Sequence, residues 1–406
     1  MNNQIPVIVL DCHIRAIEGV LYSFGRRKIP VIALSPEKDP PAFYSKYVSK
    51  KYVSPAVQEE EKLLDFLINL EERGVLLYSD DAATAFTSKN AKKLKEAGFL
   101  INVPAYEKLM KGFDKAALAR EAKKCGVPVI PTVEVKELND LQSAWQELDK
   151  PIIVKPTRLA GGKFVLIKHQ HEIEAAYHQM KSLVEDPRYL HLESGLIAQE
   201  YIEYGYDDIY CCESYYTRKN EPVGFLSIHK IRPNINQDGT SGGRLYAGET
   251  TRNPALEDFT KNILDTLEWN GLAHLDWLYS KKYDQYLLCE INPRLPGFSN
   301  LVTKVNFEMA YYYYADLADL EMPSFAYSEA LYFEALRMPG DLTGGIYSMI
   351  KGHITPASFF NSYLQIFKNK RKVYFDVLYQ KDPVFNLVSW KNFFIHLLKR
   401  PFKLLK

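Results

Sequence analysis

The segment from Leu272 to Arg294 carries the side chains best suited to chemistry. It reads as two strands, 272–279 and 285–292, joined by a polar turn centred on Tyr283. Side chains alternate between the two faces of a strand, so every second residue of each strand shares one face. The sequence therefore predicts a β-hairpin whose acidic and amide side chains lie on one side.

Two carboxylates and one amide meet on this predicted face. With the turn centred on Tyr283, Asp276 lies directly opposite Glu290, and Asn292 shares the face of Glu290. Opposed carboxylates roughly 5 Å apart repel each other, and proteins accept this cost only with a compensating cation. Three oxygen donors suit Mg²⁺ shared with substrate phosphates. An exposed polar hairpin face is the alternative, but the apolar neighbours and the trailing Arg294 favour a metal site.

A second candidate lies in residues 151–166. There a strand ends in Lys155, the chain passes through Gly161 and Gly162, and a strand returns from Phe164. Paired glycines let backbone N–H groups approach a polyphosphate, and Lys155 supplies a positive charge. Standing alone, such a pattern is more often a glycine turn beside a surface lysine. No GK[ST] follows, so the segment is not a Walker A loop.

A third candidate lies between the other two. The predicted strand 196–203 leaves the core before Gly205 and is followed by Asp207 and Asp208. Backbone groups exposed there could bond the edge of an adenine, and a carboxylate just beyond could accept the two hydroxyl groups of a ribose. Taken alone, this pattern is common.

In this order, the three segments resemble the ATP-grasp superfamily, and particularly its carboxylate–amine ligases. The most specific match is Cys289-Glu-Ile-Asn-Pro-Arg294, which looks like the E-x-N-x-R metal-binding strand of that family. Asp114-Lys115 resembles its entry lysine, and Val154-Lys-Pro156 its phosphate-binding lysine. The resemblance spans residues 6–323. The full-length layout is also similar to D-aspartate ligases that act on cell-wall precursors.

The resemblance implies a set of residues around bound ATP: Lys115, Lys155, Gly161, Gly162, Gln199, Glu200, Ile202 and Asp207. The two lysines would bind phosphates, and Glu200 and Ile202 would bond adenine through their backbones. Asp207 matches the ribose carboxylate best, with Asp208 as the alternative. The phosphate loop departs from the family because it has only two glycines.

The resemblance also implies the catalytic groups. Two Mg²⁺ ions, for which Mn²⁺ could substitute, would be held by Asp276, Glu290 and Asn292. Arg294, with Lys230 or Arg232, would stabilise the phosphoryl-transfer and tetrahedral states. Charge neutralisation by metals and cationic side chains is the main requirement of such a reaction.

Strand–helix alternation in the first part of the chain predicts a parallel, doubly wound sheet. Its expected elements are strands 7–10, 30–34, 75–78 and 99–103 and helices 14–24, 59–72 and 83–97. Ligands would bind at the carboxyl ends of these strands, where Asp11 and residues 79–81 lie. The later pattern of mixed strands and helices indicates an α+β unit.

The predicted fold class is therefore an α/β pre-grasp domain followed by an α+β ATP-grasp fold, whose two subdomains clasp ATP. Four divisions are expected: a pre-grasp domain at residues 1–110, a small lid subdomain at 111–195, a catalytic subdomain at 196–330 and a basic, aromatic C-terminal extension at 331–406. A chain of 406 residues is long enough to be divided into several subdomains.

Composition places the chain among cytoplasmic enzymes. Hydrophobic residues make up 47% and charged residues 25%, and the five cysteines are scattered, as expected in a reducing compartment. No apolar run approaches the ~20 residues of a membrane span. Residues 5–10 read as a buried first strand rather than a signal peptide.

Charge is distributed unevenly. Residues 368–406 hold ten Lys or Arg and two Asp, so this tail carries +8 and the rest of the chain −7. An acidic body disfavours nucleic-acid binding. A predicted helix from Trp390 to Leu398 is amphipathic, so it either contacts an anionic membrane surface or docks on the enzyme. The oligomeric state stays open, and a dimer is compatible with the sequence.

The expected function is an ATP- and Mg²⁺-dependent ligase. A carboxylate would attack the γ-phosphate of ATP to give an acyl phosphate and ADP, and an amine would then displace phosphate. Small-molecule carboxylate and amine substrates are implied, with an amino acid, a peptide or a cell-wall precursor as candidates. The alternatives are ligation to a thiol or another nucleophile, simple phosphoryl transfer, and a non-catalytic nucleotide-binding scaffold.

Overall fold

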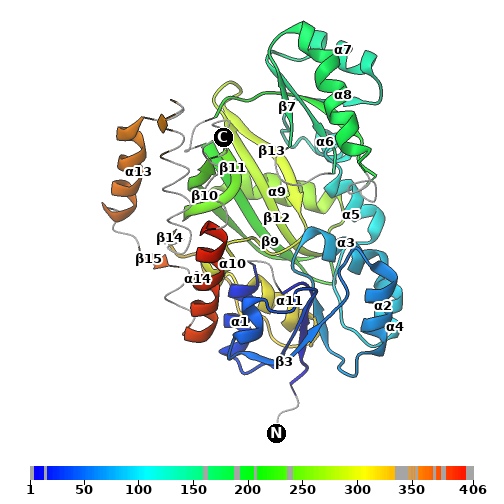
Figure 1. Ribbon diagram of the computed structural model, residues 1–406, viewed down its shortest axis with the longest axis vertical. Helices are drawn as coiled ribbons and strands as arrows, with labels where there is room; N and C mark the ends of the chain where they lie inside the picture. Colours follow the sequence, from blue (N-terminus) through cyan, green and yellow to red (C-terminus); the bar gives the residue numbers. More distant parts are fainter. Residues whose placement is uncertain are drawn as a thin grey trace.

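The described residues of the computed structural model build three β-sheets, which follow one another along the long axis of the molecule (Figure 1). The N-terminal sheet lies at the bottom of the view, the largest sheet in the middle and a small sheet at the top. The structure describes residues 4–12, 16–158, 163–186, 193–204, 208–235, 241–333, 346, 349–350, 352, 355–368, 372–375 and 381–398.

The N-terminal unit is a parallel sheet in the order β3-β2-β1-β4. Its strands are β1 (Val7–Val9), β2 (Val31–Ser35), β3 (Val48–Val53) and β4 (Val75–Leu77), and its helices are α1 (Ile17–Gly25), α2 (Glu60–Asn69), α3 (Asp81–Lys89) and α4 (Ala91–Glu96). The predicted parallel, doubly wound sheet is confirmed. The strand order reverses between β1 and β4, which is where such sheets bind ligands.

Three local predictions in this unit were wrong or incomplete. Strand β3 was not predicted, because residues 49–51 are polar and exposed on this edge strand. The predicted helix 83–97 is broken at Asn90, whose side chain bonds a backbone carbonyl of the preceding turn and so competes with the helix. The predicted strand 99–103 reduces to a single bridge at Leu100, since the chain pairs with β4 only there.

The small sheet is antiparallel in the order β5-β8-β6-β7. Its strands are β5 (Thr132–Val135), β6 (Ile152–Pro156), β7 (Val165–Ile167) and β8 (Leu196–Glu200). Helices α7 (Leu138–Glu147) and α8 (Ile173–Val184), with the short helix η2 (Gln170–Glu172), pack on it around a core that includes Leu141 and Val154. The predicted subdomain division after residue 195 therefore separates β8 from its own sheet.

The largest sheet has seven strands in the order β13-β12-β9-β10-β11-β14-β15. They are β9 (Ile209–Tyr216), β10 (Pro222–Ile235), β11 (Ser241–Thr251), β12 (Gly271–Ser280), β13 (Gln285–Asn292), β14 (Ala330–Phe333) and β15 (Lys372–Phe375). Helices α5 (Tyr106–Phe113), α6 (Lys115–Lys124) and α9 (Pro254–Thr266) lie in the same unit. Trp269 and Trp277 are buried in its core. The α/β unit followed by α+β units agrees with the predicted fold class.

Segments distant in the sequence hold the N-terminal and largest sheets together. Helices α10 (Ser299–Lys304) and α11 (Met309–Leu317) lie beside α1 (Figure 1). Gly19 allows this approach, because a Cβ atom there would lie only 2.5 Å from the Ser299 hydroxyl. Tyr313 on α11 donates a hydrogen bond to the backbone oxygen of Leu76 at 2.9 Å. The N-terminal sheet is thereby fixed relative to the hairpin that leads into α10.

The C-terminal segment is part of the same body. Strands β14 and β15 extend the largest sheet, and helix α13 (Pro356–Lys368) follows β14. Helix α14 (Pro383–Leu398) docks on the short helix η1 (Pro41–Tyr44), beside α1 in Figure 1. Phe385 is buried there, and the preceding Asp382 accepts hydrogen bonds from Ser45 and Lys46. No helix in the described part of the chain is long and apolar enough to cross a membrane.

Candidate active site

The predicted hairpin is β12 and β13, and it places Asp276 directly opposite Glu290 as expected. Near the turn, however, the pairing differs from the prediction by one residue, with Trp277 opposite Leu288. A bulge at Cys289 absorbs this difference, so the pairing regains the predicted register at Glu290. Bulges of this kind redirect side chains beside functional sites. Here the bulge keeps both carboxylates on one face.

Cations of the protein itself compensate the Asp276 carboxylate. Lys230 Nζ lies 2.5 Å from Asp276 Oδ1, and His274 Nε2 lies 3.4 Å from Oδ2. Burial alone would raise the pKa of Asp276, but Lys230 and His274 hold it well below its usual range. The compensating cation expected beside the opposed carboxylates is therefore supplied to Asp276 by the protein itself, through Lys230 and His274.

Glu290 lies in a more open environment. Its side chain is 39% exposed, and Lys115 Nζ lies 3.5 Å from Glu290 Oε2. Asn292 links the two carboxylates, since its Nδ2 donates to Asp276 Oδ2 at 3.1 Å and to Glu290 Oε1 at 3.5 Å. The Asn292 oxygen accepts from Arg294 at 3.1 Å. The structure thus places Asn292 as a donor between the predicted metal ligands, and its own role as a ligand stays a prediction.

The two predicted phosphate-binding lysines lie close to these carboxylates. Lys115 is the first residue of α6, which Asp114 caps by accepting from the amides of Ala116 and Ala117. Lys155 lies on β6, and loss of hydration, followed by the positive charge of Lys115, lowers its pKa to about 8. Two neighbouring lysines disfavour each other's charge unless an anion lies between them. This arrangement suits a phosphate.

The predicted adenine segment is β8 and the residues after it. Gln199 pairs with Ile153, so its side chain shares a sheet face with Lys155 two residues further along β6. Its Nε2 donates to Thr132, whereas its buried Oε1 has no hydrogen-bond partner in the described structure. An unpaired buried acceptor is costly, and an amino group of a ligand would satisfy it.

Glu200 and Ile202 differ in how far they fit their predicted roles. The backbone N–H of Glu200 already donates to the Pro131 oxygen at 3.1 Å, which leaves its carbonyl as the group for adenine. The buried Glu200 carboxylate accepts from Lys282 at 2.5 Å and from the Tyr283 hydroxyl. Ile202 follows the end of β8, outside the regular sheet, where its backbone is not part of a strand ladder.

Arg294 connects the hairpin to the N-terminal sheet. Its Nε donates to Asp81 Oδ1 at 2.9 Å, and Asp81 begins α3 directly after the carboxyl end of β4. Thr84 on α3 also donates to the Pro293 backbone oxygen at 3.2 Å. The strand ends predicted to bind a ligand therefore adjoin the hairpin that carries the predicted metal ligands.

Several predicted residues cannot be placed in the site. Gly161, Gly162 and Asp207 lie outside the described residues, and Arg232 is described only by its backbone, which pairs with Ala247 in β10 and β11. Asp208, the alternative ribose carboxylate, is buried and accepts from Lys281 at 2.9 Å. Lys230 lies beneath Asp276 as its counter-ion, and its contact with a phosphate or acyl phosphate stays a prediction.

Sequence reasoning missed His274 and Glu213. His274 stands two residues before Asp276 and therefore shares its face, a signal that strand alternation could have revealed. Glu213 lies opposite His274 on β9, and no local pattern pairs these two strands. Lys282 and Tyr283, which bind the Glu200 carboxylate, lie in the turn between β12 and β13. This contact also could not be predicted from local sequence patterns.

No model of a protein family matches the chain. Alanine–anticapsin ligase from Bacillus amyloliquefaciens is 28% identical over 165 residues, which cover 38% of this chain and 34% of that protein. N5-carboxyaminoimidazole synthetase from Staphylococcus aureus has a similar structure, with a TM-score of 0.62 at 16% identity over 85% of this chain and 86% of that one.

A third similar protein is the biotin carboxylase domain of Hydrogenobacter thermophilus 2-oxoglutarate carboxylase, solved with MgADP and bicarbonate. It has a TM-score of 0.61 at 13% identity, covering 80% of this chain and 72% of that one. The chain spans only about a third of the length of the curated relatives that it matches, 34% and 37% in two cases. The fold is the ATP-grasp fold that these solved structures share. In sequence, part of the chain is similar to alanine–anticapsin ligase.

Proposed function

We propose that this protein is an ATP- and Mg²⁺-dependent ligase that activates a carboxylate as an acyl phosphate and transfers it to an amine, releasing ADP and phosphate. The observation that carries the proposal is the pairing of Asp276 with Glu290 beside Lys115 and Lys155. Carboxylates for a hard cation and lysines for phosphates are the two components that phosphoryl transfer requires.

The residues present fit both implied ligands. Asp276 and Glu290 offer oxygen donors to Mg²⁺, which when bound would neutralise charge on the transferring phosphoryl group. For the nucleotide, the unpaired Gln199 Oε1 faces the same side of the small sheet as Lys155. Lys115 and Lys155 would bind the phosphates, and Arg294 would stabilise negative charge as it develops on the acyl group.

The carboxylate and amine substrates would bind between the hairpin and the N-terminal sheet. Asp81 holds Arg294 there at 2.9 Å, at the point where the strand order of the sheet reverses. Open α/β sheets bind ligands at this point. A dimer, a cytoplasmic location and the absence of a nucleic-acid partner remain predictions.

The reaction can be tested with a trap. Purified protein is incubated with Mg-ATP, a panel of D- and L-amino acids and dipeptides, and hydroxylamine, a small amine that converts an acyl phosphate into a hydroxamate. We expect ADP release that depends on Mg²⁺ and on one carboxylate, together with the hydroxamate by mass spectrometry. Nucleotide binding without ADP release would favour a scaffold, and ADP release that depends only on a thiol would favour the other ligase class.

We also propose that the C-terminal helix gives the enzyme a peripheral contact with an anionic membrane surface. Helix α14 is docked through Phe385, but Val384, Leu387 and Ile395 are 53%, 71% and 38% exposed. The tail at residues 368–406, to which α14 belongs, carries a net charge of +8, and apolar side chains beside basic ones favour anionic lipid. Co-sedimentation with phosphatidylserine vesicles should be lost in Leu387→Ser with Ile395→Ser. Equal sedimentation of this variant and the parent would contradict the contact.

A further inference from the structure

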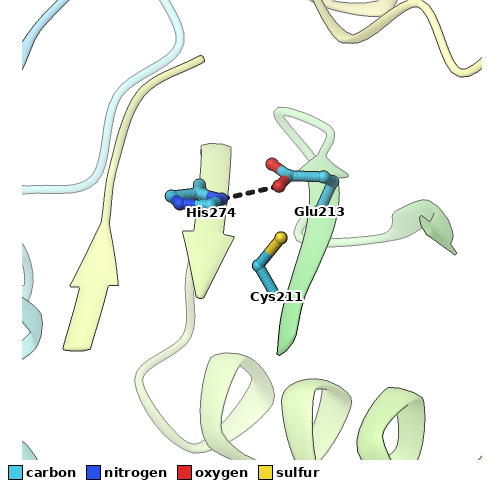
Figure 2. A group of neighbouring side chains, drawn as sticks. All are labelled: Cys211, Glu213 and His274. Carbon is cyan, nitrogen blue, oxygen red and sulfur yellow. Dashed lines mark hydrogen bonds and ion pairs between the residues drawn. The ribbon is translucent and has the colours of Figure 1, made fainter. Parts of the chain in front are cut away.

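Three buried side chains gather directly behind the predicted metal ligands: Cys211 and Glu213 on β9 and His274 on β12. The Cys211 sulfur, a carboxylate oxygen of Glu213 and a ring nitrogen of His274 all lie within 4.8 Å of one another, and each of these atoms could bind a metal. Glu213 is the cross-strand partner of His274, and Cys211 is the partner of Asp276. Figure 2 shows His274 and Glu213 pointing toward each other, with the Cys211 thiol beside them. All four side chains therefore belong to one face of the sheet.

This trio could be a further cation site, but its hydrogen bonds favour another role. His274 Nδ1 lies 2.6 Å from Glu213 Oε1, and His274 Nε2 lies 3.4 Å from Asp276 Oδ2, so carboxylates engage both ring nitrogens. The Cys211 thiol donates to the Ile228 backbone oxygen, with a sulfur–oxygen distance of 3.8 Å. The atoms that a metal would need are thus already used within the protein.

The cost of this arrangement points to a function. The Glu213 side chain has no exposed surface, and its Oε2 is buried without a hydrogen-bond partner in the described structure. A buried carboxylate with an unpaired oxygen destabilises a fold. Its one ion-pair partner within 4 Å among the described residues is His274. We therefore infer that Glu213 controls the orientation of the His274 imidazole ring.

The ring in turn controls Asp276. Phe298 packs edge-on against His274, with ring centroids 5.7 Å apart, so this packing and the contact with Glu213 both restrain the imidazole ring. Its Nε2 then points at Asp276 Oδ2, while Lys230 binds Oδ1. Side chains behind metal ligands that fix their orientation commonly set the affinity of a site.

We propose that Glu213 and His274 form a buried positioning pair that orients the Asp276 carboxylate for the divalent cation. The inference rests on the proposed function, because it assumes that Asp276 is a metal ligand. Neither residue is among those that we assign to the nucleotide or to the reacting groups. Their effect would appear first in cation affinity and only through it in turnover.

The test measures binding of Mn²⁺ in the presence of the non-hydrolysable nucleotide AMP-PNP, by electron paramagnetic resonance. The main variant is Glu213→Met with His274→Phe, which replaces both members by apolar groups of similar size. Such replacements of a whole buried pair often preserve stability. We expect this variant to melt near the parent temperature but to bind Mn²⁺ 10- to 100-fold more weakly, the usual effect of losing a partner behind a ligand.

Two further variants keep the test decisive if the double variant does not fold. His274→Asn retains a donor toward Glu213 but does not reach Asp276, so it should weaken Mn²⁺ binding as much as the double variant does. Cys211→Ser is the matched control, since it changes the third member of the cluster and leaves Glu213 and His274 in place, and it should bind Mn²⁺ like the parent.

The outcomes separate this inference from the proposed function. A folded double variant, or His274→Asn, with parental Mn²⁺ affinity overturns the positioning pair while leaving the ligase intact. A zinc ion that copurifies with the parent and is lost in Cys211→Ser would show that the trio is a metal site instead. A parent protein that binds no Mn²⁺ with AMP-PNP overturns the proposed function and this inference together.

Discussion

Asp276 and Glu290 face each other across the β12–β13 hairpin, yet their electrostatic environments differ sharply. Asp276 is 18% exposed and lies against the fully buried Lys230, whereas Glu290 is 39% exposed and has only Lys115 at 3.5 Å as an ion-pair partner in the described structure. We therefore expect these two residues, which appear equivalent in the sequence, to contribute differently to stability.

The first prediction follows from this asymmetry. Glu290→Gln should change the free energy of unfolding by no more than about 0.5 kcal/mol, because an exposed ion pair contributes little. Asp276→Asn should cost about 3 kcal/mol, since it leaves the charge of Lys230 buried without its partner. Denaturant unfolding without nucleotide measures both values. Equal destabilisation by the two substitutions would contradict the asymmetry.

Mg-ATP should affect both variants in the same way. Ligand that binds only the native state raises the melting temperature of the parent, and removal of either carboxylate should abolish most of this rise. ADP release should fall at least 100-fold in Glu290→Gln, although its fold is intact. Near-parental turnover of this variant would remove Glu290 from the metal site.

The second prediction concerns Lys155. Lys155→Met should weaken ATP binding by about 1.5–3 kcal/mol, the contribution of one charge-assisted contact, and leave adenosine binding unchanged. Lys168→Met, an exposed lysine just after β7, is the matched control and should bind both ligands like the parent. Calorimetric titration with ATP and with adenosine provides the measurement. Equal weakening toward the two ligands would place Lys155 away from the phosphates.

The third prediction concerns pH and Asp11, which follows β1 at the predicted ligand-binding edge. Burial, and then the charge of Asp80, raises the pKa of Asp11 to about 7. Between about pH 4 and pH 7 the folded state therefore keeps a proton that the unfolded state releases. Stability due to this group is present at low pH and is lost as the pH rises toward 7, by up to about 4 kcal/mol at 1.36 kcal/mol per pKa unit.

Asp11→Asn should remove this pH dependence. The parent should lose unfolding free energy between pH 4 and pH 8, and the variant should lose about 2–4 kcal/mol less over the same range. Asp65→Asn, an exposed carboxylate on α2, serves as the control and should follow the parent curve. An unchanged pH profile in Asp11→Asn would mean that Asp11 is already ionised in the folded protein.

The fourth prediction concerns the contact between the hairpin and the N-terminal sheet. Asp81→Ala removes the acceptor that holds Arg294 Nε at 2.9 Å. We expect ADP release to fall about tenfold because Arg294 loses its orientation, while ATP affinity stays within about twofold, since Asp81 touches no nucleotide-binding residue that we propose. Asp81→Asn, which still offers an oxygen to Arg294, should recover most of the turnover. Loss of ATP affinity in Asp81→Ala would instead place this contact in the nucleotide site.

The sequence by itself determined the elements whose signals are local. Strand–helix alternation predicted the parallel N-terminal sheet, and the hairpin pattern predicted that Asp276 faces Glu290. The cap of α6 by Asp114 is local in the same sense, because a cap and its helix are neighbours in the chain. Such features depend on periodicities of two or about four residues, which a short segment displays completely.

Only the tertiary structure decided how the charges are compensated. Lys230 reaches Asp276 from β10, and Glu213 reaches His274 from β9, because strand order in the largest sheet brings these segments together. The bulge at Cys289 likewise depends on pairing at both ends of the hairpin rather than on its turn. Ion pairs between residues tens of positions apart leave no periodic signal in a sequence. Their geometry exists only once the sheets have formed.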